Sequence, residues 1–224
     1  MKVCKGYINS IYSGSAVDGT GLRVVVFFSG CNLTCKFCHN PETLFIAGQE
    51  ISVEELTKKV LRYKGYLKNG GVTLSGGEPF LQKDFALSVI EELKKHGIKT
   101  AIETNGHIVD EELIKASEYL IVDVKNQEQK DLTVYRDFLN ACQKLQKGVE
   151  LTSVIVKAVN DKEEDVNALK CLKTQFSCVF NIRLLPFHKL CEEKYKKLNR
   201  EFLYKDRLEP TKEDMQKLQS LVEK

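Results

Sequence analysis

Hydrophobic positions follow two patterns along this chain of 224 residues: short apolar runs, and longer segments in which apolar residues recur every three or four positions. The short runs predict strands and the longer segments predict helices. Strands are expected at residues 23–28, 72–74, 99–102, 119–122, 150–156 and 179–185. Because helices separate them, right-handed crossovers should join these strands into a parallel sheet.

Two of the predicted helices carry start or stop signals. Ser52 and, three residues later, Glu55 fit a capping box, and apolar residues follow at helical spacing as far as Leu67. The next helix includes residues 86–93 and stops at Gly97, a natural position for a left-handed cap. Further helices are predicted at residues 110–116, 135–146, 163–173 and 212–222.

The number of strand and helix units sets the predicted fold class. Six such units are fewer than the eight of a closed barrel, so we expect an α/β fold, a partial (βα)6 barrel that stays open at one side, with parallel strands and outer helices. No linker rich in Gly, Ser or Pro interrupts the chain, and one domain is expected over residues 1–224.

Composition excludes several classes of protein. With 42% hydrophobic and 29% charged residues, the chain is expected to be globular. Its longest apolar run, at 24–28, is far shorter than the roughly 20 residues that span a bilayer, and the N-terminus has no secretory apolar segment, so we expect a cytoplasmic protein without a membrane partner. The net charge of +3 is dispersed, and nothing indicates a nucleic-acid partner.

Five of the predicted strands end in polar, Gly-rich or ionisable residues. The first is followed by a cysteine-rich loop at residues 30–39, and the others by SGGEP, ETNG, DVK and PFH. Because the carboxyl ends of the strands form the active-site face of α/β barrels, these groups should converge on one mouth. The pattern predicts a cofactor-binding enzyme.

The loop places Cys31, Cys35 and Cys38 within eight residues. In a reducing compartment such thiols favour metal binding or catalysis over disulfides. Three thiolates would hold a 4Fe–4S cluster and leave one iron open to an exchangeable ligand. The alternative is zinc, with His39 or a distant cysteine as the fourth ligand. His39 directly follows Cys38, a poor spacing for two ligands of one tetrahedral ion, and this favours the cluster.

The motifs resemble those of a known family. CNLTCKFC has the CxxxCxxC pattern of the radical S-adenosylmethionine enzymes, and VDGTGLR, CHN, GGVTLSGGEP, ETNG, DVK and LLPFH occur in the order seen in pyruvate formate-lyase activating enzymes. The resemblance runs from about Gly6 to the final helix and covers nearly the whole chain.

The resemblance implies a definite chemistry. S-adenosylmethionine binds the open iron of one oxygen-sensitive 4Fe–4S cluster and is cleaved reductively, and the 5′-deoxyadenosyl radical abstracts hydrogen from a glycine Cα of a glycyl radical enzyme such as pyruvate formate-lyase. The cofactor carries this chemistry, so no side chain is assigned a catalytic role. A reduced flavodoxin or ferredoxin as electron donor and a monomeric state are also implied. The alternatives are a radical enzyme acting on a small molecule, like 7-carboxy-7-deazaguanine synthase, and a zinc-stabilised binding module.

The resemblance also implies the site residues. Cys31, Cys35 and Cys38, and no other cysteine, would hold the cluster. Residues implied to bind S-adenosylmethionine are Phe37, His39, Gly76, Gly77, Glu78, Asp123, Val124, Lys125 and His188. The two glycines would let the backbone approach the methionine moiety. Lys125 would pair with its carboxylate, and Asp123 would contact the ribose or the amino end.

Three stretches depart from the family pattern or carry a weaker signal. Glu103 and Thr104 stand where related activases commonly have Asp-Thr, a monovalent cation site, and oxygen ligands would still suit a hard cation. Residues 126–141 lack the expected His and Thr-Gly elements, so the partner-facing surface would differ. Asp18 would accept a hydrogen bond from a partner peptide; an Asp-Gly turn is the alternative.

The remaining cysteines predict no second cluster. None lies between Cys38 and Glu78, so an insert carrying extra clusters is absent. The dispersed thiols are expected to be structural: Cys4, Cys142, Cys171, Cys178 and Cys191. The Lys- and Glu-rich segment at 189–205 is expected to be a solvated surface with helical stretches.

Overall fold

The protein is described from a computed structural model, in which residues 4–126 and 131–223 are described. The chain forms two compact units. Unit 1 contains residues 4–34, 42–104 and 108–121, and unit 2 contains residues 35–41, 105–107, 122–126 and 131–223. The cysteine loop therefore passes from unit 1 to unit 2 between Thr34 and Cys35. Whether residues 1–224 fold as one domain stays a prediction.

The described strands form one open sheet in the order β3-β1-β2-β4-β5-β6-β7-β8. The six predicted strands are all present: β2 (Arg23–Phe28), β4 (Gly71–Gly76), β5 (Thr100–Thr104), β6 (Leu120–Asp123), β7 (Val149–Ile155) and β8 (Val179–Pro186). Pairing is parallel between β2 and β4 and between β4 and β5 in unit 1, and between β7 and β8 in unit 2. The predicted α/β fold with an open, mostly parallel sheet is confirmed.

Two strands were not predicted, β1 (Lys5–Ser15) and β3 (Gln49–Ser52). β1 pairs antiparallel with both β2 and β3. Its register against β2 shifts between Ile8 and Ser10 and again between Ser13 and Ser15. These irregularities break the alternation of buried and exposed residues on which recognition of a strand from sequence depends.

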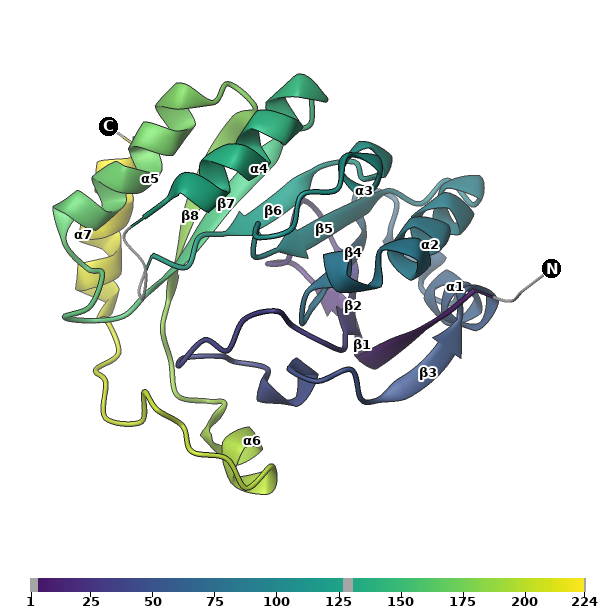
Figure 1. Cartoon of the computed structure of the whole chain (residues 1–224), viewed down its shortest axis with the longest axis horizontal. Helices are drawn as coiled ribbons and strands as arrows, with labels where there is room; N and C mark the ends of the chain where they lie inside the picture. Colours follow the sequence, from purple (N-terminus) through teal and green to yellow (C-terminus); the bar gives the residue numbers. More distant parts are fainter. Residues whose placement is uncertain (1–3, 127–130, 224) are drawn as a thin grey trace. The chain divides into compact units, whose positions relative to one another are not determined.

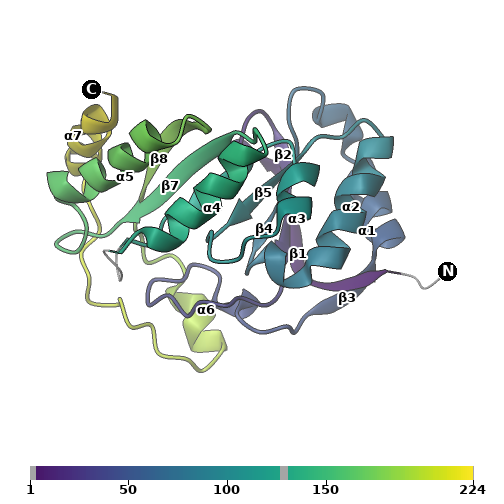
Figure 2. The same cartoon turned by 45° about the horizontal axis from the view of Figure 1, so that its top comes forward.

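The helices of unit 1 begin and end near the predicted signals. α1 (Val53–Leu61), α2 (Lys83–Lys95) and α3 (Glu111–Ala116) form a row in which α1 packs on α2 and α2 on α3 (Figures 1 and 2). The Ser52 capping box is present, because its side chain accepts from Glu55 N and the Glu55 carboxylate accepts from Ser52 N. α1 is shorter than the apolar pattern suggested, and a 3-10 turn (Lys64–Tyr66) follows it.

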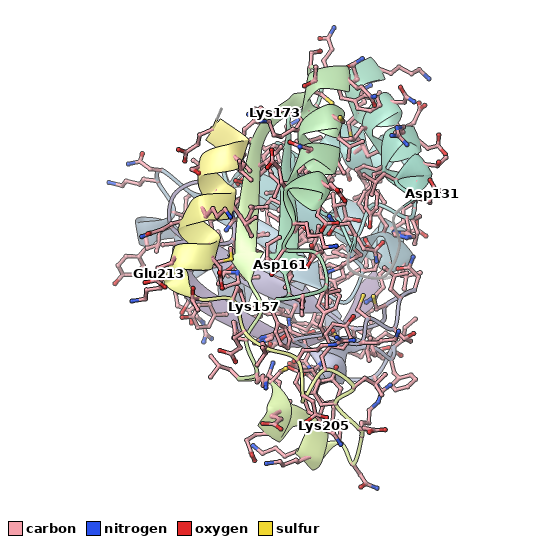
Figure 3. The ribbon with its side chains drawn as sticks, turned by 90° about the vertical axis from the view of Figure 1, so that its left-hand side faces the viewer. Asp131, Lys157, Asp161, Lys173, Lys205 and Glu213 are labelled. Atoms are coloured by element: carbon pink, nitrogen blue, oxygen red, sulfur yellow. The ribbon has the colours of Figure 1, made fainter. Side chains whose placement is uncertain are left out.

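Unit 2 contains α4 (Thr133–Lys144), α5 (Glu163–Gln175), α6 (Glu192–Lys197) and α7 (Lys212–Glu223). α7 packs against α5 and β8. An ion pair holds the start of α7, with 2.6 Å between Lys157 Nζ and Asp214 Oδ2. Figure 3 labels Lys157, Asp161 and Glu213 around this end of α7.

The segment at 189–205 contains a helix and is mostly exposed, as its composition predicted, but part of it packs inward. It contributes four buried side chains to an aromatic cluster that also contains Phe37, Val156 and Phe187. The four are Cys191, Tyr195, Phe202 and Tyr204. In Figures 1 and 2, α6 lies apart from α5 and α7. Charged residues surround these four side chains, and Leu190, Leu198 and Leu203 are exposed, so composition alone hid which apolar residues pack inward. Across the described residues, no helix is long and apolar enough to cross a membrane.

Candidate functional site

In unit 1 the glycine turn after β4 packs directly on the start of the cysteine loop. Gly76 has φ +103°, a conformation that favours glycine. A Cβ on Gly77 would lie 2.1 Å from the carbonyl oxygen of Gly30, so only glycine fits there. Glu78 N donates to the same oxygen at 2.7 Å. The two glycines therefore have a packing role next to Cys31, and their contact with S-adenosylmethionine stays a prediction.

Two acidic side chains of unit 1 are held by neighbouring hydroxyl groups. The Glu78 carboxylate is fully buried, and its Oε1 accepts from Thr104 Oγ1 at 2.9 Å and from Phe80 N at 3.1 Å. Glu103 accepts a hydrogen bond from Ser75. The structure thus brings Glu78, Glu103 and Thr104 together at the ends of β4 and β5. Cation binding by Glu103 and Thr104 stays a prediction.

Asp18 lies at the opposite end of β2 from the glycine turn. Its carboxylate accepts from Ser15, and its carbonyl oxygen accepts from Thr73 Oγ1 at 2.6 Å. Ser15 pairs with Arg23 at the start of β2, whereas Gly76 pairs with Phe28 at the other end. Thr73 lies three residues before Gly76 on β4, and since a strand rises about 3.3 Å per residue, roughly 10 Å separates Asp18 from the turn. The structure does not bring Asp18 to the glycine turn, and its contact with a partner stays a prediction.

In unit 2, Asp123 and Lys125 form a largely buried ion pair at the end of β6. Lys125 Nζ also lies 5.3 Å from the centre of the Phe37 ring. Burial opposes the charge of Lys125, but the Asp123 carboxylate and Cys35 outweigh it and raise the pKa of Lys125. Asp123 Oδ1 is buried without a hydrogen-bond partner. A cation thus stands beside a carboxylate oxygen that still needs a donor.

The second half of the cysteine loop is fixed by its own side chains. Phe37 is buried in the aromatic cluster, and Cys35 packs against that cluster. Cys38 N donates to the carbonyl oxygen of Cys35 at 3.1 Å and closes a tight turn between the two thiols. The His39 and His188 rings meet edge to face, with 2.8 Å between Nε2 and Nδ1.

Each unit thus gathers a part of the predicted site. Unit 2 brings Cys35, Phe37, Cys38, His39, Asp123, Lys125 and His188 into a set linked by the contacts above. Val124, between two of these residues, is buried and donates to the carbonyl oxygen of Thr152 at 2.7 Å, which extends the sheet and leaves its side chain in the core. Among the residues described, no three His, Cys, Asp or Glu side chains converge as ligands of a single metal ion. Assignment of the three cysteines to the cluster stays a prediction.

Two residues that contact this set were not singled out from the sequence. Tyr135 Oη accepts from Lys125 N at 2.7 Å, and Lys194 Nζ donates to the carbonyl oxygen of His39 at 3.1 Å. Tyr135 lies on α4 outside any motif, and Lys194 lies on α6, 155 positions from His39. The sequence therefore carried no signal for either residue. Of the stretch 126–141, residues 127–130 lie outside the described residues.

Three of the other cysteines have environments typical of structural thiols, whereas Cys171 is exposed and Cys4 is half-buried, so a structural role for those two stays a prediction. Burial raises the pKa of Cys142 to about 12 and also raises the pKa values of Cys178 and Cys191. A raised pKa disfavours the thiolate that a metal or an electrophile requires.

Comparison with known proteins identifies the family. A family model described as a 4Fe-4S single cluster domain matches residues 17–150. The chain is 38% identical, over 97% of both chains, to the pyruvate formate-lyase-activating enzyme of Clostridium pasteurianum. The chain belongs to the family of pyruvate formate-lyase-activating enzymes. This confirms the resemblance found in the motifs and makes the protein a radical S-adenosylmethionine enzyme, an activase with one 4Fe–4S cluster.

Solved structures confirm the fold of this family member. QueE from Escherichia coli has a TM-score of 0.56 at 18% identity, covering 88% of this chain and 92% of its own. A radical SAM methyltransferase from Sphaerobacter thermophilus has a TM-score of 0.61 at 14% identity, covering 90% of this chain and 63% of its own. At these identities the likeness establishes the open α/β fold alone.

Proposed function

We propose that this protein installs a glycyl radical in a partner enzyme. The observation that carries the proposal is the match of 38% identity over 97% of both chains to a pyruvate formate-lyase-activating enzyme. The partner is then a glycyl radical enzyme of the pyruvate formate-lyase type. We further propose that the protein acts as a monomer in the cytoplasm under anaerobic conditions and that reduced flavodoxin or ferredoxin donates the electron.

The residues present suit the cofactor and cosubstrate. Cys31, Cys35 and Cys38 would hold the 4Fe–4S cluster, which when bound supplies one electron for cleavage of S-adenosylmethionine. Thiolates are the ligands that iron–sulfur clusters use. The tight turn between Cys35 and Cys38 and the packing of Gly77 on Gly30 fix the loop on both sides.

The polar groups of unit 2 match the chemistry of an amino-acid cosubstrate. The Lys125 ammonium has three donors, of which the ion pair with Asp123 requires only one, so it would also bind the methionine carboxylate. The buried Oδ1 of Asp123 would accept from the cosubstrate ammonium or a ribose hydroxyl. Phe37 and His39 would orient the adenine, with His188 holding the His39 ring. Gly76, Gly77 and Glu78 of unit 1 complete the proposed binding residues.

A protein substrate fits the absence of a cluster-bearing insert after the cysteine loop. A deoxyadenosyl radical must be shielded from side reactions, and this chain has no extra cluster domain between Cys38 and Glu78 with which to enclose it. A flexible glycine-bearing loop of the partner would supply the enclosure, with its backbone polar groups satisfied on binding.

Electron paramagnetic resonance after anaerobic mixing tests the proposal. The cluster-loaded protein, S-adenosylmethionine and a chemical reductant are mixed with a pyruvate formate-lyase-type enzyme. A stable glycyl radical signal is expected, and deuterium from a Cα-labelled glycine should appear in 5′-deoxyadenosine. A partner with the radical glycine replaced by alanine is the control and should give neither. Rapid turnover of a small metabolite without any protein radical would contradict the proposal.

A further inference from the structure

α6 contacts three consecutive residues within unit 2, the last two of the cysteine loop and the residue that follows it. Tyr195 Oη donates to the carbonyl oxygen of Cys38 at 3.0 Å. Lys194 Nζ donates to the carbonyl oxygen of His39 at 3.1 Å and to Oδ1 of Asn40 at 2.8 Å. Two adjacent side chains of one helical turn therefore hold the main chain immediately after the last cysteine of the loop.

The segment that makes these contacts is anchored by buried aromatic rings. Tyr195 is 6% exposed, and its ring centre lies 4.8 Å from that of Phe202. On the loop side, the buried Phe37 ring packs 5.9 Å from Tyr204 of the same segment. Phe37 immediately precedes Cys38, so the loop is held by its own aromatic side chain on one side of the cysteine and by α6 on the other.

We propose that Lys194 and Tyr195 are positioning residues for the iron–sulfur cluster. They fix the carbonyl groups of Cys38 and His39 and the Asn40 side chain, and Lys194 adds a positive charge beside the main chain that follows Cys38. Outer groups that orient metal ligands commonly change affinity by an order of magnitude when removed. The reduction potential of a cluster depends on nearby charge, so an ammonium group favours the reduced, more negative state. The proposal rests on the ligand set proposed above and is independent of the partner.

The two residues should differ in their effects. Lys194→Met removes both hydrogen bonds and the charge, so a chelator should extract the cluster about tenfold faster, and the midpoint potential should fall. Tyr195→Phe removes one neutral hydrogen bond and keeps the ring, so extraction should be faster with little change in the potential. Lys194→Arg should restore both properties, because a guanidinium keeps the charge and donates to more than one acceptor.

The full chain, loaded anaerobically with iron and sulfide, provides both measurements. Extraction is followed by the visible absorption of the cluster and the potential by redox titration. Lys196→Met is the matched control, since Lys196 lies on the same helix, is exposed and pairs with Glu193 at 2.7 Å. It should behave as the wild type. Thermal unfolding of the metal-free variants shows whether they fold.

Two results would overturn the proposal. One is equal extraction rates and potentials for Lys194→Met, Tyr195→Phe and Lys196→Met. The other is a lowered unfolding temperature of the metal-free Lys194 and Tyr195 variants with cluster properties unchanged, which indicates a purely structural role. Failure of the wild-type chain to hold a 4Fe–4S cluster would instead contradict the proposed function, so the two failures are distinguishable.

Discussion

The imidazole rings of His39 and His188 are 149 positions apart in the sequence and 2.8 Å apart between Nε2 and Nδ1. His39 follows the last cysteine of the loop, and His188 follows β8 in unit 2. One nitrogen must donate and the other accept, so each ring fixes the tautomer and orientation of the other. The pair ties the cysteine loop to the end of a strand, where the cosubstrate is proposed to bind.

We expect the two histidines to contribute to S-adenosylmethionine binding as a unit. His39→Ala and His188→Ala should each weaken binding, and the double variant should be less impaired than the sum of the two, with a coupling of about 0.5–3 kcal/mol. The cycle is obtained from the dissociation constants of S-adenosylmethionine for the cluster-loaded wild type, the two single variants and the double variant. A parallel cycle of His188 with His96, which lies at the end of α2 and pairs with Glu92, should be additive. Additive losses for His39 and His188 would contradict the prediction.

The fold was largely predictable because its strands are buried apolar runs. β2 reads RVVVFF and is buried at five of six positions, which the pattern of hydrophobic residues makes plain. β1 was missed because two register shifts break its alternation, and the inward-facing residues of the segment at 189–205 were hidden among lysines and glutamates. Periodicity identifies elements that are regular and fails where bulges or mixed composition intervene.

Gly77 should tolerate no side chain. A Cβ there would lie 2.1 Å from the Gly30 carbonyl oxygen, so Gly77→Ala forces the cysteine loop to move and should destabilise the chain by about 1–3 kcal/mol. Gly65→Ala is the control, because a Cβ on Gly65 meets nothing within 4 Å. Its effect should stay within about 0.5 kcal/mol. Denaturant unfolding of the metal-free variants measures both effects. Equal unfolding free energies for Gly77→Ala and Gly65→Ala would contradict the prediction.

Lys125 should have separable effects on stability and on binding. Lys125→Met leaves the Asp123 carboxylate largely buried without its cation and should destabilise the protein by about 3 kcal/mol, the low end of the range for a broken buried pair. Adding Asp123→Asn removes the uncompensated charge and should recover most of that loss. Neither variant should bind S-adenosylmethionine as the wild type does. Undiminished affinity in the Lys125→Met protein would exclude the carboxylate contact.

The motifs placed the predicted site residues at strand ends, but they did not reveal the contacts between them. DVK and GGEP placed Lys125 and Gly77 at strand ends correctly, because the carboxyl ends of parallel strands share one edge. The contact of His39 with His188 and the contact of Lys194 with the loop depend on partners 149 and 155 positions away. Such contacts leave no local pattern in a single sequence.

Acid should weaken the anchoring of α7. The ion pair with Lys157 and a hydrogen bond from Thr211 N lower the pKa of Asp214 to about 2. A carboxyl group whose pKa is lower in the folded state stabilises above its unfolded value of about 3.9, and the contribution is lost as the pH falls towards 2. Asp214→Asn should therefore flatten the decline of unfolding free energy over this range, whereas Glu213→Gln should not. If the unfolding free energies of the wild type and Asp214→Asn fall equally steeply with decreasing pH, the prediction is contradicted.

The cluster should depend on Cys31, Cys35 and Cys38 alone. Replacing any one of them with alanine removes a thiolate from a loop that has no spare cysteine, so anaerobically reconstituted variants should retain no 4Fe–4S cluster. Cys171→Ala is the matched control, because that thiol is exposed on α5. Cys142→Ala tests a buried thiol whose pKa is raised to about 12. Both should keep the full iron and sulfide content and the absorption of the wild type. Iron and sulfide analysis decides the outcome: full cluster content in the Cys38→Ala protein, or zinc as the only stable metal in the wild type, would show that the loop is not the cluster site.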